Sequence, residues 1–337
     1  MKTILIGLAL ITSISGIAQQ ESQYANIAYN PYIVNSAAGG LTDVMRFEVT
    51  GRTQWLGYDG GPRTMTLIGH SQFKLNSEED VLSEYNVKDK SLFKSPKVST
   101  GAIKHIVGGM VINDAIGPFS KTSVNGSYAI HLPFFKSFNI GLGIGMGWSN
   151  FSIDGSRVVL YQEDDLSYEQ FLGATPAQDM IDANAGLVFY NQSLFLGIST
   201  SQVFRNSMKF DGVETSSNFE RHYFLVSKYN IEMNTNWSFE PNLVGKFTVN
   251  SPSSFDIGGR FIHNQASWLS FQYRTSNALI FQIGSNLVKN IYFAYSYELG
   301  TGSIQTVNNS THEVQLGLYI GNNRKIKKEL RESEKSE

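Results

Sequence analysis

Strict alternation of large apolar and small residues over residues 138–148 is the feature that most constrains the fold. The segment has the sequence Phe-Asn-Ile-Gly-Leu-Gly-Ile-Gly-Met-Gly-Trp, so every second residue is large and apolar. Successive side chains of a β-strand point to opposite faces, which gives this strand one apolar face and one face of nearly bare backbone. Because glycine weakens a strand interior, the repeated glycines indicate a crowded environment on their side. The pattern is typical of a membrane barrel with lipid outside and a filled lumen inside.

The first residues are typical of a secretory signal peptide. Lys2 precedes an apolar run over residues 4–11, and Gly16-Ile17-Ala18 forms a small-x-small cleavage site, so we expect the mature chain to begin at Gln19. The chain contains no cysteine, which excludes a lipid-anchored lipoprotein, disulfides and thiol chemistry. No apolar stretch after the signal peptide is long enough for a membrane helix. Together these features predict a protein of the bacterial outer membrane.

Composition agrees with a large antiparallel sheet and argues against nucleic-acid binding. The chain of 337 residues has 16 Tyr, 22 Phe and 31 Gly but only 8 Pro, which suits strands joined by tight turns. Its formal net charge of −2 gives no electrostatic reason to bind nucleic acid. No linker or composition shift divides residues 43–320, so we expect one domain there.

Period-two patterning predicts an all-β fold, a transmembrane antiparallel up-and-down β-barrel of about 14 strands. An even number of strands places both chain ends on the same side of the membrane. The predicted strands cover residues 43–52, 63–74, 100–112, 122–132, 136–149, 184–191, 193–200, 220–231, 236–247, 254–263, 267–275, 278–287, 290–299 and 311–320.

The connections between these strands indicate which end faces the periplasm. Short joins such as 133–135 alternate with longer ones such as 150–183, and outer-membrane barrels have short periplasmic turns and longer external loops. The charged join 75–99 breaks this alternation and indicates either a missed hairpin or a periplasmic insertion. The chain is thus predicted to comprise a signal peptide (1–18), an N-terminal periplasmic segment (19–42), the outer-membrane β-barrel (43–321) and a charged C-terminal tail (322–337) that is either a short helix or disordered.

Residue types used in catalysis and metal binding do not form a recognisable site. The six histidines lack the spacing of metal ligands, so we expect no metal or cofactor. Ser127 and His131 share a strand face but lie four residues apart, beyond hydrogen-bond reach, so we expect no enzyme activity. The glycines of residues 141–147 lie inside a strand and open no helix, which excludes a nucleotide loop. The acidic loop 150–183 lacks the spacing of a calcium loop and is predicted to be solvated.

One turn carries residues suited to contacting another protein. The segment Tyr58-Asp59-Gly60-Gly61-Pro62 predicts a turn, because Asp can bond its own backbone, Gly adopts positive φ and Pro ends a strand. Aromatic residues dominate interface hot spots, so Trp55 and Tyr58 at an external rim would anchor a partner. We take Trp55, Tyr58 and Asp59 as candidate partner contacts.

Several rare residue combinations occur in one order along the chain. They are Tyr29-Asn30-Pro31 with Asn35-Ser36-Ala37-Ala38-Gly39-Gly40, the block from Arg52-Thr53-Gln54-Trp55 to Pro62-Arg63-Thr64, Asn113-Asp114-Ala115-Ile116-Gly117-Pro118, Arg221-His222-Tyr223 with Tyr273-Arg274, and His312-Glu313. In these motifs the chain resembles the PorP/SprF family over essentially the whole mature barrel. Two departures are Ser36, where the family usually has Pro, and the segment 75–99, which is longer than typical.

The resemblance implies an outer-membrane β-barrel of the type IX secretion system, the exporter of gliding bacteria. Members either associate with the periplasmic ring of that machine or serve one secreted protein. In the second role the barrel receives a cargo with a type B C-terminal domain, such as the gliding adhesin, and holds it at the cell surface. The implied partners are that cargo, other type IX components and outer-membrane lipid.

We predict that the barrel binds a large surface protein and anchors it or helps to export it. Two alternatives stay open: a core component of the type IX machine bound to the periplasmic ring, and a small-solute or hydrophobic transporter. The transporter would use a pathway lined by inward-facing charged residues of both signs, which give no selectivity argument. These residues are Arg46, Glu48, Arg52, Glu240, Lys246 and Arg274.

Overall fold

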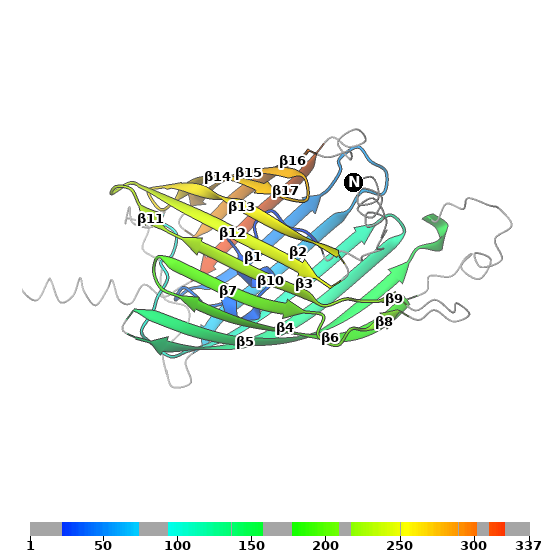
Figure 1. The fold of residues 1–337 in the computed structure, drawn as a ribbon, viewed down its shortest axis with the longest axis horizontal. Helices are drawn as coiled ribbons and strands as arrows, with labels where there is room; N and C mark the ends of the chain where they lie inside the picture. The colour runs from blue at the N-terminus through cyan, green and yellow to red at the C-terminus, as the bar shows by residue number, and fades with distance from the viewer. Residues whose placement is uncertain are drawn as a thin grey trace, which may run out of the picture.

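The computed structural model shows a closed antiparallel β-barrel of 14 strands (Figure 1). Barrel strands pair with their neighbours in the sequence, and the pairing of β17 with β1 closes the ring. The predicted fold class is therefore confirmed. The structure describes residues 22–73, 94–135, 137–157, 177–208, 217–249, 251–288, 290–301 and 310–320.

Every predicted strand overlaps one strand of the barrel. The barrel strands are β1 (Met45–Thr53), β2 (Arg63–Phe73), β3 (Lys104–Ile116), β4 (Phe119–Phe134), β5 (Phe138–Ile153), β6 (Ala177–Tyr190), β7 (Leu194–Ser201), β10 (His222–Tyr229), β12 (Trp237–Thr248), β13 (Ser251–His263), β14 (Ser267–Arg274), β15 (Ala278–Val288), β16 (Ile291–Gly300) and β17 (Thr311–Ile320). Short additional elements are the β8 (Ser207–Met208) and β9 (Ser217–Asn218) pair, β11 (Ile231–Glu232) beside β12, and the 3-10 helices η1 (Pro31–Ile33), η2 (Ser36–Ala38) and η4 (Gly155–Arg157).

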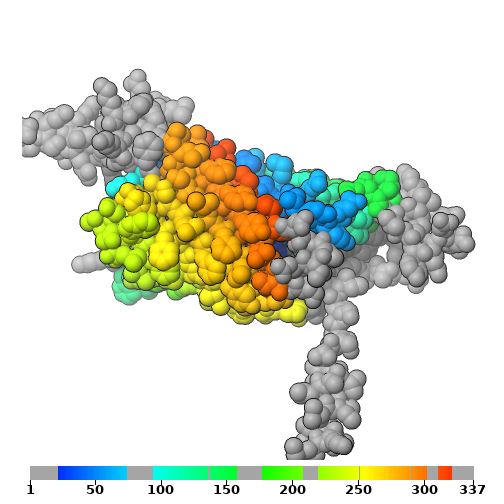
Figure 2. Space-filling view, turned by 90° about the horizontal axis from the view of Figure 1, so that it is seen from above, coloured from blue at the N-terminus to red at the C-terminus, as the bar shows by residue number. Residues whose placement is uncertain are grey.

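Apolar side chains cover the outside of the ring. On β5, Leu142, Ile144 and Met146 are 50%, 66% and 62% exposed, whereas Gly143 and Gly145 between them are buried. Figure 2 shows one side of this outer surface, with the later strands coloured yellow to red. Soluble proteins rarely expose so continuous an apolar surface, and in a membrane barrel lipid covers it.

A charge on this surface is expected to block assembly. Ile144 lies near the middle of β5, and an arginine facing lipid at mid-membrane costs roughly 2–4 kcal/mol. We therefore expect Ile144→Arg to reduce the folded, heat-modifiable fraction in outer membranes, measured by electrophoresis of unheated samples. Ile144→Met is the control because it keeps the face apolar. Equal folded fractions for the two variants would contradict the assignment of this face to lipid.

The two ends of the barrel differ in their connections. At the end where β1 begins and β17 ends, most connections are short turns, whereas the opposite end carries the longer connections 154–176, 202–221 and 301–310. By the rule for outer-membrane barrels, the first is the periplasmic end and the second the outer end. The connection from β2 to β3 is the exception at the periplasmic end. Much of the predicted insertion 75–99, the signal peptide and the C-terminal tail lie outside the described residues.

Residues 22–42 form a segment inside the barrel, which we call the plug (Figure 1, dark blue). Most of its residues are buried, and Ala37 is 0% exposed. Its two short helices have local causes: Pro31 begins η1 with a fixed φ, and the Asn35 side chain accepts the N–H of Ala37 in η2. Ser36, the departure from the family pattern, begins η2 and is 6% exposed.

The plug corrects the expected position of the N-terminal segment. The sequence predicted residues 19–42 to lie in the periplasm, whereas their described part lies in the lumen. The glycine face of β5 explains how it fits, because a Cβ at Gly143 would lie 2.6 Å from Ala37 Cα. The lumen is therefore crowded beside β5, as the alternating glycines predicted.

Candidate functional site

A cluster of buried charges lies on the lumen side of β1 and β13–β17. Arg52 pairs with Glu298 at 2.8 Å and with Glu313 at 3.1 Å, and Arg274 pairs with Asp256 at 2.9 Å and with Glu298 at 3.1 Å. All five side chains are 6% exposed or less. Removing one partner of such a pair leaves the other charge buried and uncompensated. Each charge in the cluster therefore depends on its partners for compensation.

Two members of this cluster bind the backbone of the plug. The Glu313 carboxylate accepts the N–H of Ala25 at 2.9 Å, and the Arg274 guanidinium donates to the Tyr24 carbonyl at 3.0 Å. Arg274 also donates to the Gln23 side chain at 3.1 Å. Buried backbone groups must be paired, so these charged partners fix the first described residues of the plug on the barrel wall.

Glu48 on β1 is a second attachment point. Its carboxylate accepts hydrogen bonds from Asn30 at 2.8 Å and from Asn26 at 3.3 Å. The same carboxylate pairs with Arg46 at 2.6 Å and accepts the hydroxyl of Tyr292. An acidic group thus joins two plug amides to two residues of the barrel.

Neutral groups hold the plug against the opposite side of the ring. The Asn35 amide donates to the carbonyl oxygens of Leu187 on β6 and Ile198 on β7. The Ser199 hydroxyl donates to the carbonyl of Val34 at 2.7 Å. Because these bonds use strand backbone as well as side chains, the plug supports the sheet at β6 and β7.

Tyr29 joins the plug to β12, β13 and β14. Its hydroxyl accepts hydrogen bonds from Asn242 at 3.0 Å and Gln272 at 3.1 Å and lies beside the Ser270 hydroxyl. Its ring lies 4.4 Å from the guanidinium carbon of Arg260. Burial raises the pKa of the Tyr29 hydroxyl above its usual value, so the group stays neutral.

The residues considered as a catalytic pair bind the plug instead of each other. The Ser127 hydroxyl bonds the hydroxyl of Tyr32 at 2.6 Å. His131 Nε2 donates to the Ala37 carbonyl at 2.8 Å, and its Nδ1 bonds the hydroxyl of Tyr190. Within the described ranges, no group of three or more acidic or histidine side chains could hold a metal ion, and no helix is long and apolar enough to span a membrane.

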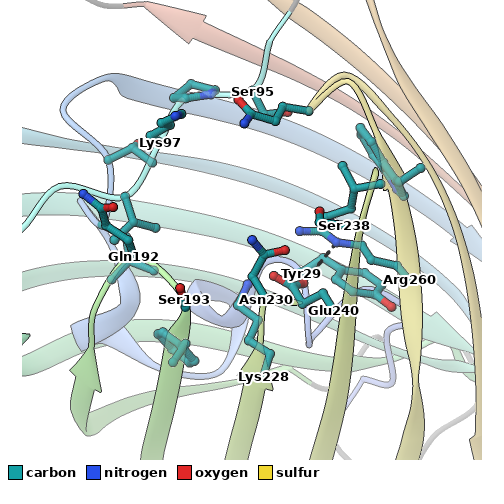
Figure 3. Close-up of a pocket in the computed structure, with 18 of the residues that line it drawn as sticks. Tyr29, Ser95, Lys97, Gln192, Ser193, Lys228, Asn230, Ser238, Glu240 and Arg260 are labelled. Atoms are coloured by element: carbon teal, nitrogen blue, oxygen red, sulfur yellow. Dashed lines mark ion pairs between the residues drawn. The ribbon is translucent and has the colours of Figure 1, made fainter. Parts of the chain in front are cut away.

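Two chambers lie on either side of the plug. The outer chamber has a volume of about 690 Å³ and is bounded by the outer ends of β3–β6. Its apolar lining includes Ile112, Ile116, Phe119, Phe151 and Phe219. The periplasmic chamber has a volume of about 550 Å³ and reaches the turns of that end (Figure 3). The chambers share no lining residue, because the plug lies between them.

The six charged residues proposed for a solute pathway all lie on the lumen side. They form ion pairs with other lumen residues, including Lys246 with Asp256 at 2.9 Å and Glu240 with Arg260 at 3.0 Å. Arg274 and Glu48 additionally bind the plug. These charges therefore hold the plug and one another and do not line an open passage through the described residues.

The candidate contact residues lie in the β1–β2 connection at the outer end, which we call the rim hairpin (residues 54–62). The rings of Trp55 and Tyr58 meet edge to face with centroids 6.3 Å apart. Tyr58 is 54% exposed and Asp59 is exposed, whereas Trp55 is only partly so. Sequence reasoning missed Leu56, which is 47% exposed beside them.

Backbone bonds fix the rim hairpin to its surroundings. The N–H of Gln54 donates to the Pro62 carbonyl at 2.8 Å and closes the hairpin. The N–H of Leu56 donates to Ser310, and the N–H of Gly117 donates to Gly60 at 2.9 Å. Gly60 and Gly117 both have positive φ, which glycine adopts without strain. The hairpin is therefore held by both neighbouring connections.

Comparison with known protein families identifies the family of the chain. The family model described as Type IX secretion system membrane protein PorP/SprF matches residues 16–318. The chain belongs to this family. It is thus a type IX secretion protein with an outer-membrane barrel fold.

Other comparisons give distant similarities. No significant match was found among curated proteins. Among solved structures, the CymD monoaromatic hydrocarbon channel has a TM-score of 0.49 at 8% identity, covering 91% of this chain and 95% of that one. The Ralstonia pickettii toluene transporter TbuX has a TM-score of 0.44 at 10% identity, with 85% and 92% covered. A Pseudomonas aeruginosa FadL homologue has a TM-score of 0.44 at 8% identity, with 87% and 92% covered.

The PorP/SprF motifs of the chain meet at the plug. Arg52, Arg274 and Glu313 come from three separate motifs and lie in one charged cluster. Asn30 and Asn35 from the first motif bind opposite sides of the barrel. Sequence reasoning named Arg52 and Arg274 only as lining of a possible solute pathway and did not select Glu313 as a site residue. Their inward parity on predicted strands was the available signal, because buried charges need partners.

Proposed function

We propose that this PorP/SprF barrel binds a large secreted protein of the type IX system at its outer rim and anchors it or helps to export it. Membership of the family supports a role in type IX secretion. The plug bonds to strands all around the ring, which supports contacts at the barrel surface over passage of a folded domain through the lumen.

The rim hairpin is the observation that carries this proposal. Three exposed or partly exposed side chains, Trp55, Leu56 and Tyr58, lie on a backbone bonded to two other connections. A fixed backbone lowers the conformational entropy lost on binding, and aromatic anchors supply most of the affinity in many interfaces. Asp59 next to them adds a charge at the rim.

We expect Trp55→Ala with Tyr58→Ala to remove one large cargo protein from the cell surface. Loss of two interface anchors typically costs about 2 kcal/mol or more each, which is enough to abolish display at cellular concentrations. Surface display is measured by immunofluorescence and by mass spectrometry of intact-cell digests. The amount of heat-modifiable barrel is measured in the same cells.

Phe135→Ala is the matched control, because Phe135 is 79% exposed but lies in the turn between β4 and β5 at the periplasmic end. Normal display in the double variant, with normal barrel abundance, would count against the rim contact. Deletion of the gene separates the alternatives. General failure of secretion would indicate a core component of the machine, and unchanged secretion with altered uptake of apolar solutes would indicate a transporter that uses the outer chamber.

A further inference from the structure

The periplasmic chamber carries an excess of positive charge, unlike the cluster of paired charges above it. Its lining contains four cationic residues and two carboxylates: Arg46, Lys97, Lys228 and Arg260 against Glu232 and Glu240. The chamber reaches the turns at the periplasmic end, so this charge faces the compartment in which periplasmic and exported proteins are found (Figure 3).

Lys228 on β10 forms no direct ion pair in the described part of the chain, although the charge of Glu240 acts on it from farther away. Its side chain makes none of the hydrogen bonds or ion pairs found there, and its ammonium group lies 5.5 Å from the centre of the Phe195 ring. Glu240, the carboxylate whose charge acts on Lys228, already pairs directly with Arg260 at 3.0 Å. The Phe195 ring compensates this charge only in part, so an ammonium group in a cavity without a directly paired carboxylate favours an anion.

The side chains of Arg46 and Arg260 are more exposed to the chamber than those of their acidic partners. The Arg46 side chain is 20% exposed and its partner Glu48 is 0% exposed, because Glu48 points to the plug amides. The Arg260 side chain is 19% exposed and Glu240 is 10% exposed. The surface that a ligand meets is therefore more positive than a count of the ion pairs indicates.

Aromatic rings lie beside the guanidinium groups of both arginines. The guanidinium carbon of Arg46 lies 5.3 Å from the Tyr292 ring and 5.9 Å from the Tyr319 ring. That of Arg260 lies 5.9 Å from the Trp268 ring. Planar cations beside aromatic rings bind carboxylates through paired N–H groups and leave apolar surface for the atoms around them.

We propose that the periplasmic chamber binds the carboxylate groups of an acidic peptide segment. Its volume of about 550 Å³ lies in the usual range of ligand pockets, roughly 300–1,000 Å³. Amide side chains from two turns, Gln192 from one and Asn234 and Asn236 from the other, line it and are suitable partners for peptide backbone groups. This site lies at the opposite end of the barrel from the rim hairpin, and the proposal does not depend on the proposed cargo contact.

The test uses the full mature protein in lipid nanodiscs. The probe is a fluorescein-labelled pentapeptide, Asp-Glu-Ser-Asp-Glu with an amidated C-terminus, and binding is measured by fluorescence anisotropy. We expect the Asn-Gln-Ser-Asn-Gln version to bind at least about tenfold more weakly, since charge-assisted hydrogen bonds are lost. A neutral Ala-Ser peptide is measured with a free C-terminus and with an amidated one. The difference in binding between these two peptides shows whether a single terminal carboxylate is sufficient for binding.

Lys228→Met is expected to weaken acidic-peptide binding by about tenfold or more. Lys121→Met is the matched control, because the Lys121 ammonium group lies 4.9 Å from the Phe219 ring in the outer chamber. Equal binding by these two variants, or equal binding of the acidic and neutral peptides, would overturn the proposal.

A second arm does not depend on the folding of Lys228→Met. Because the chain lacks cysteine, Asn234→Cys and Asn206→Cys can each be labelled with a bulky maleimide. Labelling at Asn234, which lines the periplasmic chamber, should block the acidic peptide, whereas labelling at Asn206 near the outer end should not. Binding that survives labelling at Asn234 would place the peptide elsewhere.

Discussion

Arg274→Leu is expected to lower the thermal stability of the barrel much more than removal of an exposed ion pair does. Arg274 pairs with Asp256 and Glu298 and donates to the carbonyl of Tyr24 in the plug. Leucine would leave two buried carboxylates short of a partner and the plug carbonyl unbonded. Breaking a buried pair in this way typically costs about 3–5 kcal/mol. The measurement is the temperature at which the heat-modifiable band converts to the unfolded form.

Arg205→Leu is the control for this experiment. Arg205 pairs with Glu220 at 2.9 Å, but its side chain is 49% exposed, and exposed ion pairs contribute only about 0–1 kcal/mol. The conversion temperature of Arg205→Leu should stay close to that of the natural protein. If both variants convert at one temperature, the buried cluster does not hold the barrel together.

The strand order could be predicted because a membrane barrel repeats one simple rule. Each strand alternates lipid-facing apolar residues with lumen-facing residues, and β14 and β17 were predicted almost to the residue on this basis. The rule fails where the outer face loses its large apolar groups. β6 begins at Ala177, seven residues before the predicted start. The prediction missed this stretch because its outward positions include Asp179 and the small residues Ala177 and Ala183.

The plug could not be predicted in the same way. Residues 22–42 have neither strand nor helix periodicity, and their amide and tyrosine side chains suit a solvated segment equally well. They are buried because the barrel supplies partners from distant strands, such as Glu48 for Asn30 and Glu313 for Ala25. In the sequence, only the glycine face of β5 indicated that the lumen is crowded, and this pattern did not identify the segment that fills the lumen.

The rim hairpin was found by its residue types, yet the structure adds why it is rigid. The turn residues predicted the hairpin itself. The bonds from Leu56 to Ser310 and from Gly117 to Gly60 join connections that are far apart in the sequence. Such long-range backbone bonds leave no local pattern, so the fixed presentation of Trp55 and Tyr58 follows from the three-dimensional structure alone.

Gly143→Ala is expected to displace the plug while leaving the barrel itself assembled. A Cβ at Gly143 would lie 2.6 Å from Ala37 Cα, and the obstacle is backbone, which cannot rotate away. Overpacking of this kind typically costs about 1–3 kcal/mol, which corresponds to roughly a 5- to 150-fold increase in opening of the plug. The inserted methyl group meets Ala37, so the hydrogen bond from His131 to the Ala37 carbonyl should break first.

The measurement uses a single cysteine at Ser36, a buried residue of η2, in this otherwise cysteine-free chain. The rate of maleimide labelling reports how often the plug opens. Gly126→Ala is the control, because a Cβ at Gly126 on β4 meets nothing within 4 Å. Faster labelling in Gly143→Ala, with the labelling rate in Gly126→Ala unchanged, would establish that β5 carries glycine here to admit the plug. Equal labelling rates in the two variants would mean that the plug does not rest against β5.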